Sequence, residues 1–224
     1  MRLKKLGTAL VIVAALSAGF ASSSQAFAST ENAKWYVGAG LTELKGSMSV
    51  SAEQSGSGRF VTTVSGQTVE LATSSVECVF CQIENSGTSA LGSGQLRFTG
   101  VTVLQPANCT TSSTITTQAL SITADWMSFE TNYWRLVPTS GQETAFFSFT
   151  LSGVSCSLKT AIIAKGSLFL QSEHATGYFA SSQTLDSSAS INSIAGGNFH
   201  VGTQAATLQN TLVFRASGTI FGTF

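Results

Sequence analysis

The sequence predicts an all-β protein, folded as an antiparallel β-sandwich or a closed β-barrel and cross-linked by disulfides. Three observations carry this prediction. Apolar and polar residues alternate with a period of two along most of the chain, as in strands with one buried face. Turn signals rich in Gly, Ser and Asn separate these short runs. Four Cys and 15 Phe in 224 residues supply cross-links and large apolar side chains for a core.

The expected strands follow from this alternation. A hairpin is predicted at residues 59–71, around a Ser65-Gly66 turn. Residues 95–103 alternate with a shift of one position at Gly100, which predicts one strand with a bulge there. Many short strands joined by turns favour a sandwich or a barrel. Further strands are expected at residues 114–123, 144–151, 165–171 and 206–214.

The N-terminal residues have the three-part pattern of a secretory signal peptide. Residues 2–5 carry a basic head, residues 6–20 are an uncharged apolar run, and residues 26–28 form an A-x-A cleavage site. The apolar run is too short for a comfortable membrane span. We expect residues 1–28 to be removed, residues 29–224 to form one all-β domain without an integral membrane span, and the product to be secreted, extracellular or associated with the cell surface.

The charge balance argues against nucleic acid as a partner. The full chain has 11 Lys and Arg and 11 Asp and Glu, and removal of residues 1–28 takes away three basic residues, so the mature net charge is −3 (8 − 11). Such a chain has no basic footprint for nucleic acid or anionic lipid. The remaining partners are a cell envelope, a glycan or a protein, and the sequence does not fix the oligomeric state.

The four cysteines, Cys78, Cys81, Cys109 and Cys156, are interpreted as two disulfides. A zinc site would need a second matching cysteine pair, and a redox site would need the C-x-x-C motif to open a helix, whereas its neighbours favour strand. Three connectivities are possible. Cysteines i and i+3 of an extended strand lie roughly 10 Å apart, so a Cys78–Cys81 bridge needs a turn or bulge. We nevertheless predict Cys78–Cys81 and Cys109–Cys156, with the other pairings left open.

The sequence has neither a nucleophile elbow nor a phosphate-binding glycine loop. Its two histidines, His174 and His200, are not linked by any motif to a carboxylate or a serine. We therefore expect no catalytic, cofactor-binding or metal-binding residue and no cofactor. A secreted hydrolase with a dispersed active site stays open as an alternative.

Two other patterns suggest binding or membrane association. Trp126, Tyr133 and Trp134 surround a predicted hairpin turn at residues 130–132. If exposed, these rings would stack on sugar faces in a carbohydrate- or apolar-ligand-binding module; if buried, they belong to the core, which is the interpretation we favour. Residues 214–224 alternate up to a terminal Phe, like the last strand of an outer-membrane β-barrel, although the four cysteines and the few charges argue against that alternative.

Two long segments, residues 77–109 and 165–208, resemble a family of secreted, β-rich proteins of high-GC Gram-positive bacteria. The resemblance rests on C-x-x-C followed by I-x-N and by G-x-L-x-F-T-G-V-T-V, and it covers most of residues 33–224. It implies export and supplies no active-site residue. It also implies that glycine is common between the two cysteines, so Phe80 departs from the family pattern. The function expected is that of a secreted, non-enzymatic surface, extracellular-matrix or adhesion-like protein.

Overall fold

The structure, a computed structural model, describes residues 33–128, 131–172, 179–188, 191 and 197–223. As the sequence predicts, these residues are mostly β-strand. The strands are β1 (Trp35–Val37), β2 (Thr42–Glu43), β3 (Ser47–Val64), β4 (Gln67–Thr73), β5 (Ser75–Ser86), β6 (Ser89–Thr99), β7 (Thr102–Gln105), β8 (Thr114–Thr116), β9 (Leu120–Ser128), β10 (Thr131–Pro138), β11 (Ala145–Thr150), β12 (Ala161–Lys165), β13 (Leu168–Ser172), β14 (Ser182–Ser187), β15 (His200–Val201), β16 (Gln204–Ala205), β17 (Thr207–Ala216) and β18 (Phe221–Thr223).

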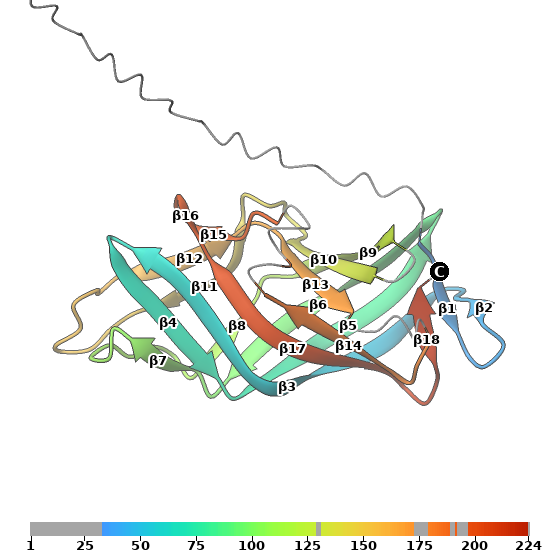
Figure 1. Cartoon of the computed structure of the whole chain (residues 1–224), viewed down its shortest axis with the longest axis horizontal. Helices are drawn as coiled ribbons and strands as arrows, with labels where there is room; N and C mark the ends of the chain where they lie inside the picture. The colour runs from blue at the N-terminus through green and yellow to red at the C-terminus, as the bar shows by residue number, and fades with distance from the viewer. Residues whose placement is uncertain (1–32, 129–130, 173–178, 189–190, 192–196, 224) are drawn as a thin grey trace, which may run out of the picture.

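Eight of these strands close into an antiparallel barrel (Figure 1). Their order around the barrel is β3-β17-β14-β13-β10-β9-β6-β5 and back to β3. The barrel closes because β17 pairs with β14 along one edge and with β3 along the other. Of the two predicted architectures, the sandwich and the closed barrel, the chain therefore adopts the barrel.

The alternating sequence explains which side of the barrel wall is buried. In β17, Leu208, Leu212 and Phe214 are buried, whereas Gln209 and Arg215, whose side chains alternate with them, are exposed. In β3 the exposed positions are mainly Ser, with Glu and Arg. The wall therefore turns apolar side chains inward and polar side chains toward water.

Two smaller sheets lie at opposite ends of the molecule (Figure 1). The sheet β18-β1-β2 packs against the barrel through Trp35, whose ring centroid lies 5.0 Å from that of Trp134. The sheet β11-β12-β15-β16 packs through aromatic rings: Phe147 of β11 lies 5.3 Å from Phe60 of β3 and 5.8 Å from Phe98 of β6. Both contacts belong to one continuous core.

Two strand predictions are corrected. The strand expected at residues 95–103 ends at Thr99, and β7 pairs with β4 instead of continuing β6. Gly100 turns the chain there with a φ of +59°, and a Cβ at this position would also collide with the side chain of Ser74. The strand expected at residues 114–123 is divided into β8 and β9, which pair with different halves of β6.

Candidate functional site

The predicted stacking residues lie in β9 and β10, and the structure buries those whose side chains it describes. Trp134 is 2 % exposed, and its ring lies 4.7 Å from that of Phe214. Tyr133 is buried on the opposite face of β10, and this burial raises the pKa of its phenol. The side chain of Trp126 lies outside the described part of the chain. The rings of Tyr133 and Trp134 are therefore buried in this structure and form no platform on its surface.

The histidines add no assembled site to the described residues. The imidazole Nδ1 of His200 contacts the backbone carbonyl oxygen of Asn198, and His174 lies outside the described residues. In the same part of the chain no three His, Cys, Asp or Glu side chains gather in a way that could hold a metal ion. The sulfur atoms of the four cysteines are joined in disulfides. What the structure does assemble are two disulfide-bridged loops.

The first of these loops, here called the Phe80 loop, comprises residues 78–81 of β5. Cys78 and Cys81 form a disulfide, with their Cα atoms 5.7 Å apart. The register between β5 and β6 shifts by one residue at this point, so Phe80 and Cys81 together stand opposite Gly94. This is a β-bulge, which shortens the strand locally. The bulge that a Cys78–Cys81 bridge requires is therefore formed by the cysteine motif itself.

Phe80 stands on this bulge with its side chain in water. Its side chain is 86 % exposed, although Phe is among the residues most often buried. Its backbone φ is +55°, in the left-handed region that bulky side chains rarely adopt. Holding a non-glycine residue there costs on the order of 1–2 kcal/mol. Cys81, its neighbour, is buried in the core. The disulfide therefore anchors on the inside a loop that presents an aromatic ring on the outside.

Gly94 of β6 makes room for this disulfide. A Cβ at position 94 would collide with the Sγ of Cys81 and would lie 3.0 Å from the Cα of Cys81. Both atoms belong to a bridged residue in a paired strand, so neither has a low-cost way to move aside. The Phe80 loop thus depends on a glycine in the neighbouring strand.

The wall around the Phe80 loop is polar. On β6, Ser93 and Gln95 are the paired residues on either side of the bulge. Nearby, Arg97 donates a hydrogen bond of 2.6 Å to the carboxylate of Glu77 across the same strand pair. This hydrogen bond lowers the pKa of Glu77. Exposed Glu53 of β3 pairs with Glu77, and exposed Arg215 of β17 pairs with Ser51, so the surroundings of the ring offer hydroxyl and amide groups together with charges of both signs that balance.

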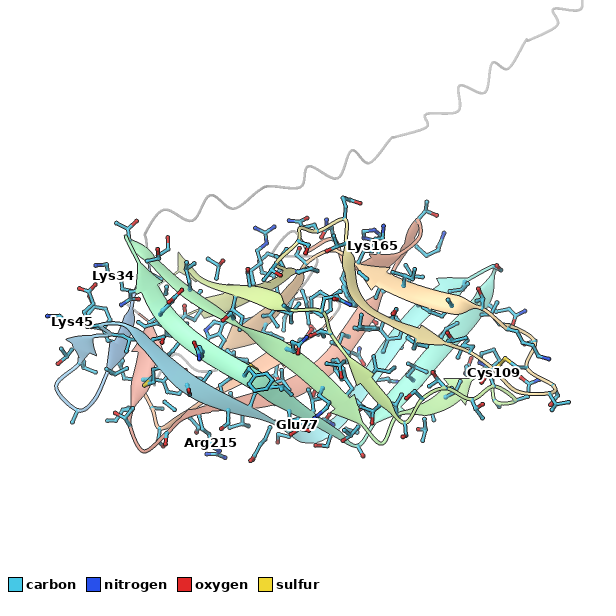
Figure 2. All side chains as sticks on the ribbon, turned by 180° about the vertical axis from the view of Figure 1, so that it is seen from behind. Lys34, Lys45, Glu77, Cys109, Lys165 and Arg215 are labelled. Atoms are coloured by element: carbon cyan, nitrogen blue, oxygen red, sulfur yellow. A yellow bond between two sulfur atoms is a disulfide. The ribbon has the colours of Figure 1, made fainter. Side chains whose placement is uncertain are left out.

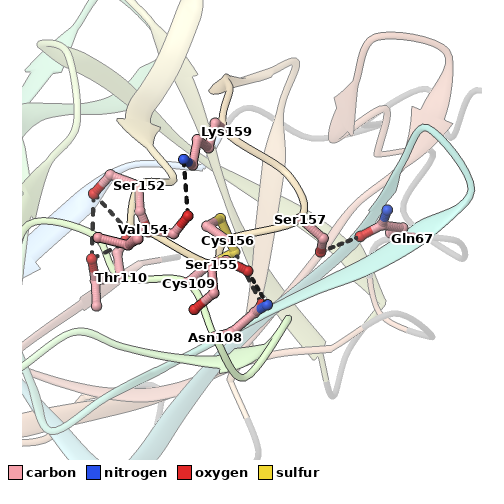
Figure 3. Close-up of a disulfide and its surroundings, with 10 residues drawn as sticks. All are labelled: Gln67, Asn108, Cys109, Thr110, Ser152, Val154, Ser155, Cys156, Ser157 and Lys159. Carbon is pink, nitrogen blue, oxygen red and sulfur yellow. Dashed lines mark hydrogen bonds between the residues drawn. A yellow bond between two sulfur atoms is a disulfide. The ribbon is translucent and has the colours of Figure 1, made fainter.

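The second loop, here called the Val154 loop, comprises residues 152–156 (Figure 3). Cys156 is bridged to Cys109, with their Cα atoms 4.5 Å apart. Both cysteines are buried. The two disulfides that the sequence analysis predicted are both present. Thr110 and Ser152 exchange two backbone hydrogen bonds, of 2.8 and 2.9 Å, beside the bridge. Val154, at the tip, is 99 % exposed.

Polar contacts brace the Val154 loop from several sides (Figure 3). The ammonium of Lys159 donates to the carbonyl of Val154 at 3.1 Å, and the amide of Asn108 donates to the carbonyl of Ser155. The hydroxyl of Ser157 donates to the side-chain oxygen of Gln67 in β4 at 3.0 Å. The loop is therefore tied both to the segment after β7 and to the β3–β4 hairpin.

One apolar cavity lined by described residues is small. An apolar cavity of about 20 Å³ lies between the barrel and the four-stranded sheet. Among the side chains that line it are Phe60, Leu71, Phe98, Phe147 and Leu208. A cavity of this size holds about one water-sized sphere. This cavity is too small for an organic ligand.

Comparison of the chain with protein-family models, with curated proteins and with solved structures found no match. No helix among the described residues has both the length and the apolar character needed to cross a membrane. The candidate site must therefore be argued from its own geometry.

Sequence reasoning identified the cysteines but missed Phe80 and Gly94 as parts of a site. A usable signal was present, because a bridge between residues i and i+3 of a strand requires a bulge. A bulge redirects the residues within it, so one residue between the cysteines has to point away from the core. The sequence does not say which of Val79 and Phe80 this is.

Proposed function

We propose that this chain is a secreted, non-enzymatic β-barrel protein that acts through its surface, as an adhesion-like or extracellular-matrix component. The observation that carries the proposal is the Phe80 loop, where a strained backbone and a disulfide hold an aromatic ring in water. Strained conformations persist where the surrounding structure imposes them, and they cluster at functional surfaces. Exposed, rigid aromatic side chains are typical anchors of recognition.

Export to an oxidising compartment is part of the same proposal. Two disulfides suit an extracellular or cell-surface protein, because cytosolic thiols are kept reduced. The signal-peptide pattern of residues 1–28 and the resemblance to secreted β-rich proteins support the same location. The polar outer face of β3 supports a wall that works in contact with water.

Secretion is tested by producing the full chain in a Gram-positive host and sequencing the N-terminus of the protein found in the medium. We expect a mature chain beginning at Ser29, without reactive thiols when it is unfolded under non-reducing conditions. Retention inside the cell with residues 1–28 still attached would contradict the proposed location.

Surface recognition is tested with the mature chain immobilised and isolated bacterial envelope fragments as the probe. We expect the wild type to retain the fragments and Phe80→Ser to lose most of this retention. Val154→Ser is the matched control, since it removes an exposed apolar side chain from the other bridged loop, and it should retain the fragments. Equal retention by the wild type and F80S, or no retention by the wild type, would overturn the proposal.

A further inference from the structure

We propose that Phe80 is the stacking platform of a binding site for neutral sugar units, the ligand of the surface that the proposed function assigns to this protein. The inference rests on that function and adds the chemical class of the ligand. It depends on three properties of the Phe80 loop: the fixed presentation of the ring, its separation from the other exposed large apolar side chains, and the polar rim around it, whose charges balance.

The ring is presented in a fixed way. The disulfide from Cys78 to Cys81 spans the bulge, and Cys81 is buried in the core, so the backbone of Phe80 has little freedom. The Phe side chain itself has only two rotatable bonds. A platform that is already ordered loses little conformational entropy when a ligand binds, which favours the binding of small, weakly held units.

The ring is also isolated. The other exposed large apolar side chains in the described residues lie on other elements: Leu41 after β1, Leu104 in β7, Val154 in its own loop and Ile163 in β12. A lipid surface is bound by a broad apolar face with basic residues beside it. A stable protein interface buries about 800 Å² per partner around an apolar centre. One ring on a polar wall fits neither.

The rim matches hydroxyl groups. Ser93 and Gln95 flank the bulge on β6, and Gln82 follows it on β5. On the other side of β5, Ser51 of β3 lies between the two β3 residues that pair with β5 before and after the loop. Serine hydroxyls and glutamine amides both donate and accept hydrogen bonds. The amide nitrogen of Gln95 already donates one hydrogen bond, of 3.2 Å, to the carbonyl of Thr117, and its side-chain oxygen is still an acceptor.

Charged side chains also stand around the rim: exposed Glu53 of β3 pairs with Glu77, and exposed Arg215 of β17 pairs with Ser51. Together with Arg97, which bonds to Glu77, they make two acidic and two basic groups, so their formal charges balance. The rim therefore has no net charge that would favour an anionic over a cationic ligand.

A sugar ring has the complementary surface. One face presents C–H groups, which pack on the electron-rich face of an aromatic ring, and its edge presents hydroxyls that reach toward the serine and glutamine side chains. We expect one ring with a polar rim to bind weakly, with a dissociation constant on the order of 1 mM per sugar unit. Several copies of the protein on one polysaccharide would then hold by multivalency. This mode of binding suits an adhesion-like role.

The test uses the mature, disulfide-intact protein and neutral oligosaccharides (cello-, xylo- and chito-oligosaccharides) at about 10 mM, tenfold above the expected dissociation constant. Amide chemical shifts measured by NMR report where each binds. We expect shifts confined to residues 77–82 and 93–97 for at least one of them. Phe80→Tyr, which keeps the ring face, should retain binding, whereas Phe80→Leu, which keeps an apolar side chain without the ring face, should weaken binding at least about tenfold.

Val154→Ser is the control and should bind the oligosaccharides like the wild type. Absence of shifts with every oligosaccharide, or equal binding by Phe80→Leu and the wild type, would overturn the inference. A Phe80-dependent dimer in sedimentation, or Phe80-dependent binding to phosphatidylcholine vesicles, without oligosaccharide binding would overturn it in favour of those partners. If envelope fragments are retained through Phe80 while no oligosaccharide binds, the sugar inference fails and the proposed function stands.

Discussion

The two disulfide-bridged loops both expose an apolar side chain, but they hold it in different ways. The Phe80 loop is a bulge in the barrel wall, closed over a sequence separation of 3, and its exposed residue has a positive φ. The Val154 loop joins chain segments with a sequence separation of 47, and Val154 is not among the described residues with positive φ. Glu77, next to the Phe80 loop, lies near the middle of the molecule, whereas Cys109 lies toward one end (Figure 2).

The difference shows what each disulfide does. The Val154 loop is braced by hydrogen bonds to Thr110, Asn108 and Lys159, so its bridge ties together two connections that already fit. The Phe80 loop has a backbone that an unbridged strand would avoid, and its bridge holds that conformation. The Cys78–Cys81 disulfide therefore serves the presentation of a side chain, and the Cys109–Cys156 disulfide serves the stability of the fold.

The largest expected effect on the free energy of unfolding comes from removing the Cys109–Cys156 disulfide. Replacing Cys109 and Cys156 by Ser should lower the free energy of unfolding by about 4 kcal/mol, because the bridge closes a long loop of the unfolded chain. Replacing Cys78 and Cys81 by Ser should cost about 2 kcal/mol by the same reasoning. Denaturation in guanidinium chloride measures both variants against the wild type. A larger loss for the short bridge would contradict the assignment of roles.

The next effect concerns the glycine beneath the Phe80 loop. Gly94→Ala should lower the free energy of unfolding by about 1–3 kcal/mol, because its methyl group would collide with the sulfur of Cys81. Gly40→Ala is the matched control, since the nearest atom a Cβ would meet there is 3.9 Å away. Thermal denaturation compares the two. Equal melting temperatures of G94A and the wild type would show that the loop has room to move.

The sequence predicted much of the fold and little of the site, for physical reasons. Alternation predicts a strand such as β17 because successive side chains of a strand point to opposite faces. The pattern of burial is therefore written in the sequence of the strand itself. The Gly94 contact with Cys81 joins two strands, so a single-sequence pattern contains no trace of it. The same limit applies to Trp134 and Tyr133, whose burial depends on what covers each face of β10. Alternation also left sandwich and barrel undecided, because closure depends on β17 pairing with β3.

A smaller effect, of opposite sign, is expected at Phe80 itself. Phe80→Gly should raise the free energy of unfolding by up to about 1 kcal/mol, since glycine adopts positive φ without strain, although part of the gain is offset by the greater entropy of the unfolded chain. Chemical denaturation measures the change, and the envelope-fragment assay should show lost retention in the same variant. Such an exchange of binding for stability is expected where strain serves function. A destabilised F80G would mean that the ring packs on the wall.

Stability at alkaline pH tests the burial of Tyr133, a residue that the sequence analysis considered as a stacking platform. Because burial raises the pKa of Tyr133, the folded protein keeps its phenol proton at a pH where the unfolded chain, with a tyrosine pKa of about 10, releases it. The unfolded state then binds fewer protons, so the free energy of unfolding should fall as pH rises above about 10. Denaturation curves at increasing pH measure this fall. Tyr133→Phe should make it shallower, and an unchanged slope would contradict the burial of this phenol.

The smallest effect is expected at the tip of the Val154 loop. Val154→Ser should change the free energy of unfolding by less than about 0.5 kcal/mol, because its side chain is 99 % exposed and Lys159 bonds to its backbone carbonyl, which the substitution keeps. Denaturation of V154S beside F80G makes the comparison direct: one exposed apolar side chain is removed from an unstrained backbone and the other from a strained one. Equal changes in the two variants would mean that positive φ at Phe80 stores no strain. The bridge between Cys78 and Cys81 would then have no conformation to enforce, and Phe80 would stand in water for the same reason as Val154.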